Sequence, residues 1–129
     1  MNRHLDTGVW MRKRAWEELE SFIRKEACIA PTKPISPQST VEHDLGQQGD
    51  DADTFMQRFF EVFRVDRGDY DFHRYFLMEG EGILYHLLMK LSNKPHSFGR
   101  ETLTVGMLHR ALVSGKWNSE ALSQLSLHS

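Results

Sequence analysis

A short run of apolar residues constrains the fold of this chain more than any other feature of its sequence. Between positions 52 and 63, apolar side chains occupy offsets 0, 3, 4, 7, 8 and 11. The members of this stripe are Ala52, Phe55, Met56, Phe59, Phe60 and Phe63. That spacing places the whole stripe along one side of an α-helix. The segment is therefore predicted to be an amphipathic helix with one buried side.

Residues on either side of the stripe predict where this helix begins and ends. Gly49 and Asp50 suit a turn and an N-cap. Asp51 and Asp53 add negative charge to the first turn, where the helix dipole favours it. The segment 66–69 is expected to stop the helix, because Gly68 within it can adopt the positive φ that other residues avoid.

Helical patterns recur elsewhere in the chain. Apolar residues at three- and four-residue spacing predict a first helix at about 11–27. A short helical turn rich in aromatic residues is expected at 70–76. The apolar run 83–91 is interpreted as a buried helix, with a central strand as the alternative.

A last helix is predicted to begin after Thr104, which is a good N-cap, and to close at Gly115 as its C-cap. Its inward residues are expected to be Val105, Leu108, Ala111 and Leu112. The tail from Asn118 is expected to fray or to form one weak turn. Together these patterns predict an all-α fold.

Prolines mark the longest connection. Pro31, Pro34 and Pro37 follow the first helix and predict an extended loop of roughly twenty residues, either a packed crossover or a mobile arm. A second loop is expected at 95–99.

Length and composition describe an ordinary soluble globular protein. The chain has 129 residues, of which 40% are hydrophobic and 26% charged, so a single domain over 1–129 is expected, with its core at about 12–117. A formal net charge of −2 argues against binding nucleic acid through bulk positive charge.

The longest apolar run is too short to span a bilayer, and the N-terminus lacks the apolar stretch of a signal peptide. With one cysteine, Cys28, no internal disulfide can form, and a cytoplasmic location is expected.

The segment from 35 to 57 is strongly acidic. It contains five carboxylates and no lysine or arginine, and those five are Glu42, Asp44, Asp50, Asp51 and Asp53. Such a surface attracts basic partners and orients their approach. The alternative is that the aspartates only cap and solvate a helix.

The sequence shows no recognisable catalytic or metal-binding motif. The aspartates lack the spacing of a calcium loop, and no two histidines stand at the i, i+4 spacing of a zinc-binding helix. A Cys28 nucleophile would need a base brought from elsewhere in the fold. We therefore expect no catalytic residue and no metal, and a small enzyme stays an alternative.

Particular segments resemble known families. The sequence Val-Glu-His-Asp-Leu-Gly at 41–46, followed by helix starts at Asp50 and at Thr104, resembles the acyl carrier protein pattern. The segments 59–72 and 103–117 resemble, more specifically, the domain of unknown function 1493 family, small enterobacterial proteins described as acyl-carrier-like. The resemblance covers about residues 12–117. It implies an acyl-carrier-like bundle of three to four helices with a long first loop.

The resemblance also implies what the chain lacks. Carrier proteins have Asp-Ser-Leu at the head of the second helix, where the serine hydroxyl carries phosphopantetheine. Here Gly49 occupies the expected serine position, so no cofactor is expected. The alternative is a genuine acyl or peptidyl carrier modified at a non-standard serine, the nearest being Ser36 and Ser39.

Carriers of this type are bound through an acidic face on the second helix, and the resemblance extends this role to the present chain. The expected function is a non-enzymatic interaction module that contacts a basic patch on a partner protein. The residues expected to make this contact are Asp50, Asp51, Asp53, Gln57 and Glu61. Trp10, Trp117 and the leucine-rich tail are candidates for a further exposed patch, while the oligomeric state is not predicted.

Overall fold

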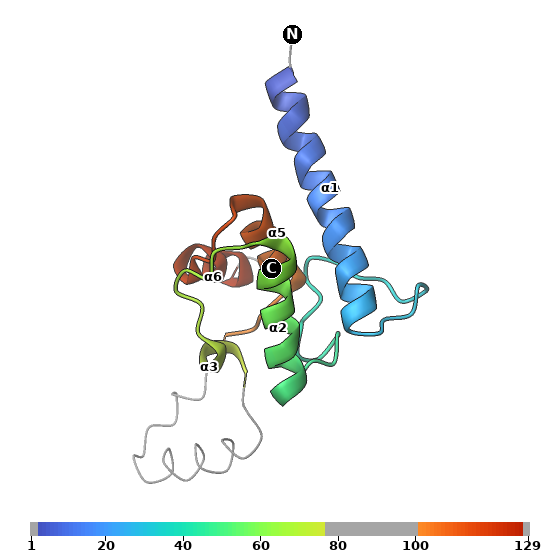
Figure 1. The fold of residues 1–129 in the computed structure, drawn as a ribbon, viewed down its shortest axis with the longest axis vertical. Helices are drawn as coiled ribbons and strands as arrows, with labels where there is room; N and C mark the ends of the chain where they lie inside the picture. The colour runs from blue at the N-terminus through green and yellow to red at the C-terminus, as the bar shows by residue number, and fades with distance from the viewer. Residues whose placement is uncertain (1–2, 77–100, 128–129) are drawn as a thin grey trace.

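A computed structural model describes the backbone of residues 3–76 and 101–127, and the side chains of residues 11–76 and 101–124. This part of the chain is helical, with two isolated β-bridges and no strand (Figure 1). Its helices are α1 (Arg3–Glu26), α2 (Gly49–Phe63), α3 (Phe72–Tyr75), α5 (Val105–Ser114) and α6 (Ser119–Leu127). The all-α prediction is confirmed, and the described helices already outnumber the three to four expected. The predicted helix at 83–91 and the loop at 95–99 lie outside the described residues.

Helix α1 begins at Arg3, well before the predicted residue 11, and ends at Glu26. The prediction missed the start because it followed the apolar stripe, whereas the N-terminal part of α1 extends beyond the other helices (Figure 1). At its other end the Arg24 guanidinium donates to the carbonyls of Ala30 and Lys33, at 2.7 and 3.0 Å. These bonds turn the chain back after α1.

The proline-containing loop is a packed crossover. Val41 and Leu45 are buried in the core. The backbone N–H of Val41 donates to Leu103 at 2.9 Å, and that of Gly106 donates to Pro37 at 2.9 Å. The loop therefore holds the start of α5 against the rest of the core.

Helix α2 follows the predicted stripe but not its predicted ends. The stripe residues are buried except for the half-buried Phe63. The N-cap is Gln48, not Gly49 or Asp50, and its side chain makes no capping bond. Arg64 ends the helix with φ 53°, so the helix stops before Gly68, which instead has φ +51° in the following turn. The left-handed conformation of Arg64 is one that residues other than glycine rarely adopt, whereas the extended conformation of Gln48 is open to any residue.

The capping predictions for α5 are confirmed. The Thr104 hydroxyl accepts from the backbone N–H of Met107 at 3.3 Å. Gly115 closes the helix with φ 81°. Val105, Leu108 and Ala111 are buried, as expected, and Leu112 is half-buried.

The tail is more ordered than the sequence predicts. It forms α6, and Leu122 is buried against the core. The backbone N–H of Ser119 donates to the Asp69 carboxylate at 2.9 Å, which satisfies the start of α6 from a distant turn. Trp117 has no exposed surface, so the prediction of an exposed patch there is wrong. Its ring packs among Phe60, Tyr70 and Tyr75 instead.

No described helix is both long enough and apolar enough to cross a membrane.

Candidate interaction surface

The predicted partner-binding residues occupy the outward side of α2. Asp50, Asp51, Gln57 and Glu61 are exposed, and Asp53 is half-buried. Residues 50, 53, 57 and 61 stand at i, i+3, i+7 and i+11, so they share one side of the helix. Asp51 is rotated about 100° from Asp50, toward α1. We call the surface of these five residues the acidic face.

Three carboxylates of the acidic face also interact within the helix itself. Asp50 and Asp51 lie in the first turn of α2, where the partial positive charge of the helix terminus favours them. Asp53 accepts a hydrogen bond from the Gln57 amide at 2.9 Å. Asp53 is therefore held by a side-chain hydrogen bond within α2, whereas Asp50 and Asp51 interact with the helix through its terminal charge.

The remaining carboxylates of the acidic segment are used in the crossover loop. Asp44 accepts from the backbone N–H of Thr40 at 2.7 Å and from its hydroxyl at 3.1 Å. These hydrogen bonds lower the pKa of Asp44. Glu42 lies 3.8 Å from the His43 ring. The structure thus separates a structural loop from the acidic face.

The structure places the residues that the sequence offered for or against phosphopantetheine attachment at the head of α2 and in the crossover loop. Gly49 is buried with φ 55° and has no side chain to modify. Ser36 and Ser39 are half-buried in the crossover loop, and their hydroxyl oxygens lie 3.5 Å apart. The Ser39 hydroxyl also accepts from the backbone N–H of Ser36 at 3.0 Å.

A groove between α1 and α2 was not predicted from the sequence. Its volume is about 560 Å³, and we call it the α1–α2 groove. It is lined by Glu17, Glu18, Ser21, Phe22, Lys25, Glu26, Arg58, Val62 and Phe63. The one available signal was Val62, an apolar residue that stands outside the buried stripe and is 47% exposed.

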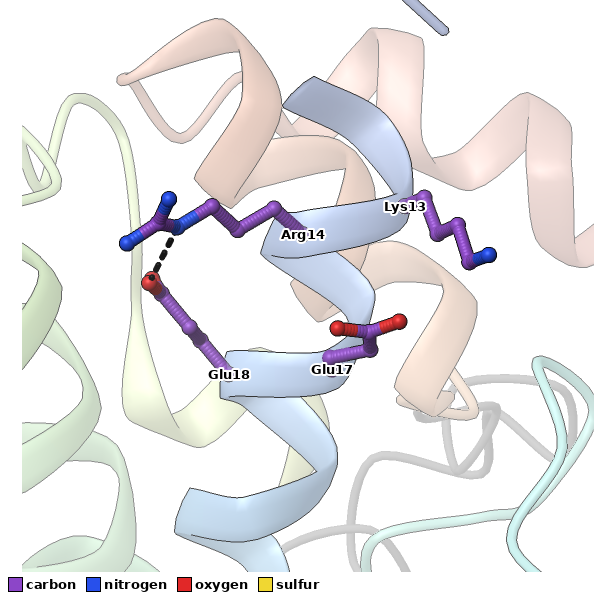
Figure 2. Close-up of a pocket in the computed structure, with 4 residues that line it drawn as sticks. All are labelled: Lys13, Arg14, Glu17 and Glu18. Atoms are coloured by element: carbon purple, nitrogen blue, oxygen red, sulfur yellow. Dashed lines mark hydrogen bonds and ion pairs between the residues drawn. The ribbon is translucent and has the colours of Figure 1, made fainter. Parts of the chain in front are cut away.

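A second hollow of about 400 Å³ lies along α1, toward its N-terminus from the groove. Its described lining is entirely charged, and Figure 2 shows Arg14 and Glu18 pointing toward each other on one side. Their ion pair is 3.2 Å long, and both side chains are more than half exposed. Such a pair contributes little to stability. Cys28 and the histidines line neither hollow among the described residues.

Tyr70 is a half-buried residue whose ring packs beside α2. Its ring centroid lies 4.9 Å from that of Phe60. The hydroxyl is buried and makes no hydrogen bond within the described part of the chain. Burial raises the pKa of Tyr70, and the negative charge of Asp53 raises it further.

Among the described side chains, at 11–76 and 101–124, no group of three or more His, Cys, Asp or Glu residues could hold a metal ion.

Comparison with protein families matches residues 15–119 to the model described as "Protein of unknown function (DUF1493)". No curated protein and no solved structure matches the chain.

Proposed function

The chain belongs to the DUF1493 family of proteins of unknown function, and we propose that it is a non-enzymatic interaction module for a partner protein with a basic patch. In this proposal the acidic face of α2 makes the contact, and the fold is an acyl-carrier-like one that works without phosphopantetheine. The exposed, free thiol of Cys28 is compatible with the cytoplasmic location that we include in the proposal.

One observation carries this proposal. The side of α2 opposite the buried stripe presents Asp50, Asp51 and Glu61 to solvent. Exposed charges of one sign accelerate and orient the approach of an oppositely charged surface more than they tighten the final complex. Their energetic contribution therefore depends strongly on salt.

Affinity co-purification at low salt from the cells of origin tests the proposal. The test variant is Asp50→Lys with Asp51→Lys, and Asp53 is kept because its carboxylate holds Gln57. We expect the wild-type chain to capture a partner with a basic surface and the double variant to lose it.

A matched control distinguishes the effect of where the charges lie from the effect of the total change in net charge. Glu42→Lys with Glu120→Lys changes the net charge equally, and Glu120, like Asp50, lies in the first turn of an exposed helix end. The control should retain the partner. Equal capture by the wild type and the Asp50/Asp51 variant would contradict the proposal, provided that circular dichroism shows both to be folded.

A further inference from the structure

The α1–α2 groove combines apolar and charged side chains in a way that the core does not require. Phe22 and Phe63 form its apolar wall, with ring centroids 5.3 Å apart. Phe63 is half-buried, and Val62 beside it is 47% exposed. A single exposed valine is ordinary on a protein surface, but here it lies in a concave site next to a partly exposed aromatic ring.

The two helices that form the groove are antiparallel. Figure 1 shows α1 and α2 running in opposite directions, and the contacts agree, since Phe22 meets Phe63 and Glu26 meets Arg58. A cleft between two antiparallel helices suits a third helix, because its side chains can pack between their ridges.

The charges of the groove are unevenly paired. Arg58 and Glu26 form an ion pair of 3.1 Å from α2 to α1, and Glu18 is paired with Arg14. Glu17 and Lys25 form no ion pair with any described residue. They are eight residues apart on α1, which is about 12 Å along the helix axis at 1.5 Å per residue. The groove therefore has an acidic end at Glu17 and a basic end at Lys25.

We propose that the α1–α2 groove binds an amphipathic helix of the partner, with an aliphatic side chain on Val62 and Phe63. Charge complementarity defines the ends of this helix: a lysine or arginine meets Glu17, and an aspartate or glutamate meets Lys25. The inference rests on the proposed function, because it adds an apolar anchor to the electrostatic contact of the acidic face. Arg58 and Val62 stand seven and eleven residues after Asp51 on α2, so one partner can reach both surfaces.

Three synthetic helical peptides test the charge pattern. All carry the same central leucines, and their end residues, eight positions apart, are Lys and Glu, Lys and Lys, or Glu and Glu. Fluorescence anisotropy with the full-length chain should give the tightest binding to the Lys/Glu peptide, by about threefold to tenfold, because the others place like charges together at one end.

Substitutions in the groove should change this preference in a defined way. Lys25→Glu makes both ends acidic and should favour the Lys/Lys peptide, and Glu17→Lys should favour the Glu/Glu peptide. Val62→Asp should weaken binding of every peptide at least about tenfold, because it places a charge on the apolar anchor. Val113→Asp is the matched control: Val113 is 44% exposed on α5, outside the groove, and its substitution should leave binding unchanged.

Several results would overturn the inference. They are the absence of saturable binding, equal binding by Val62→Asp and Val113→Asp, or a charge preference that ignores Glu17 and Lys25. A different outcome is that no peptide binds and the chain dimerises with increasing concentration. If Val62→Asp abolishes that dimerisation, the groove binds a second copy of the chain instead. If peptides fail while the Asp50/Asp51 variant still loses its partner, only this inference falls and the proposed function stands.

Discussion

Two tyrosines pack against Trp117, and they differ in whether their hydroxyl groups are satisfied. The Tyr75 hydroxyl accepts from the Trp117 indole N–H at 3.3 Å and donates to the Ser119 hydroxyl at 3.4 Å. The Tyr70 hydroxyl is buried without a partner in the described part of the chain. A buried polar group without a hydrogen bond costs about 1–3 kcal/mol, whereas a satisfied one is mildly favourable. The buried hydroxyl group is therefore expected to destabilise the fold at Tyr70 and to stabilise it at Tyr75.

Phenylalanine substitutions test this difference. Tyr70→Phe removes an unsatisfied hydroxyl and should raise the free energy of unfolding by about 1 kcal/mol. Tyr75→Phe leaves the indole N–H of Trp117 without its acceptor and should lower it by about 1 kcal/mol or more. Urea unfolding at pH 7 measures both. Shifts of the same sign would show that the Tyr70 hydroxyl is satisfied.

Of the four glycines Gly46, Gly68, Gly106 and Gly115, Gly68 is the one at which a side chain would meet the closest backbone atom. It has φ +51°, and a Cβ atom there would overlap the backbone carbonyl oxygen of Trp117. Gly46 has φ +69° but open space around its Cα. Gly46→Ala should cost about 1 kcal/mol for the left-handed backbone alone, and Gly68→Ala at least about 2 kcal/mol. Equal losses of stability in thermal melts would contradict the close approach at Trp117.

At the scale of the elements, periodicity was a better guide than residue identity. The stripe from Ala52 to Phe63 predicted the buried side of α2, because a helix has 3.6 residues per turn. The acidic face lies on the remaining side of the helix, so its outward position followed from the same periodicity. Its ends were mispredicted because Gln48 and Arg64, not Gly49 and Gly68, take the capping positions. Neither residue is a preferred cap, so tertiary packing outweighed local preference there.

Helix α6 shows why the tail was underestimated. Its first turn is held by Asp69, fifty residues earlier in the chain, and such a long-range cap leaves no local pattern. The hydrogen bond from the Ser119 backbone N–H lowers the pKa of Asp69 below its usual range, against the weaker opposing effect of burial. A lowered pKa in the folded state means that the charged form stabilises the fold above about pH 4, and that this contribution is lost as the pH falls toward the lowered value.

Asp69→Asn should therefore reduce stability at neutral pH but not in acid. The expected loss at pH 7 is below about 1 kcal/mol, since the carboxylate is exposed and partly screened by solvent. The difference between the variant and the wild type should narrow as the pH falls from about 5 to about 2. Chemical unfolding at a series of pH values measures it. A difference that is constant with pH would show that the Asp69 charge does not stabilise α6.

For the whole molecule, the sequence predicted the outward side of α2 but not which surfaces come together. The acidic face required only the register of one helix. The α1–α2 groove required the approach of α1 to α2, which brings together Glu26 and Arg58 from positions 32 residues apart. Trp117 was a candidate for an exposed patch, yet its ring packs among Phe60, Tyr70 and Tyr75. Contacts between residues so far apart in the sequence leave no periodic pattern from which they could be predicted.

The central claim about this protein is that charges on the acidic face of α2 recognise a basic partner. The most direct measurement is the association rate between the chain and its captured partner over a range of salt concentrations. For the wild type, the rate should fall at least about tenfold between about 20 mM and 500 mM salt, because screening shortens the reach of Asp50 and Asp51. The Asp50→Lys/Asp51→Lys variant should associate slowly at every salt concentration. Equal rates for the two proteins at low salt would contradict the account.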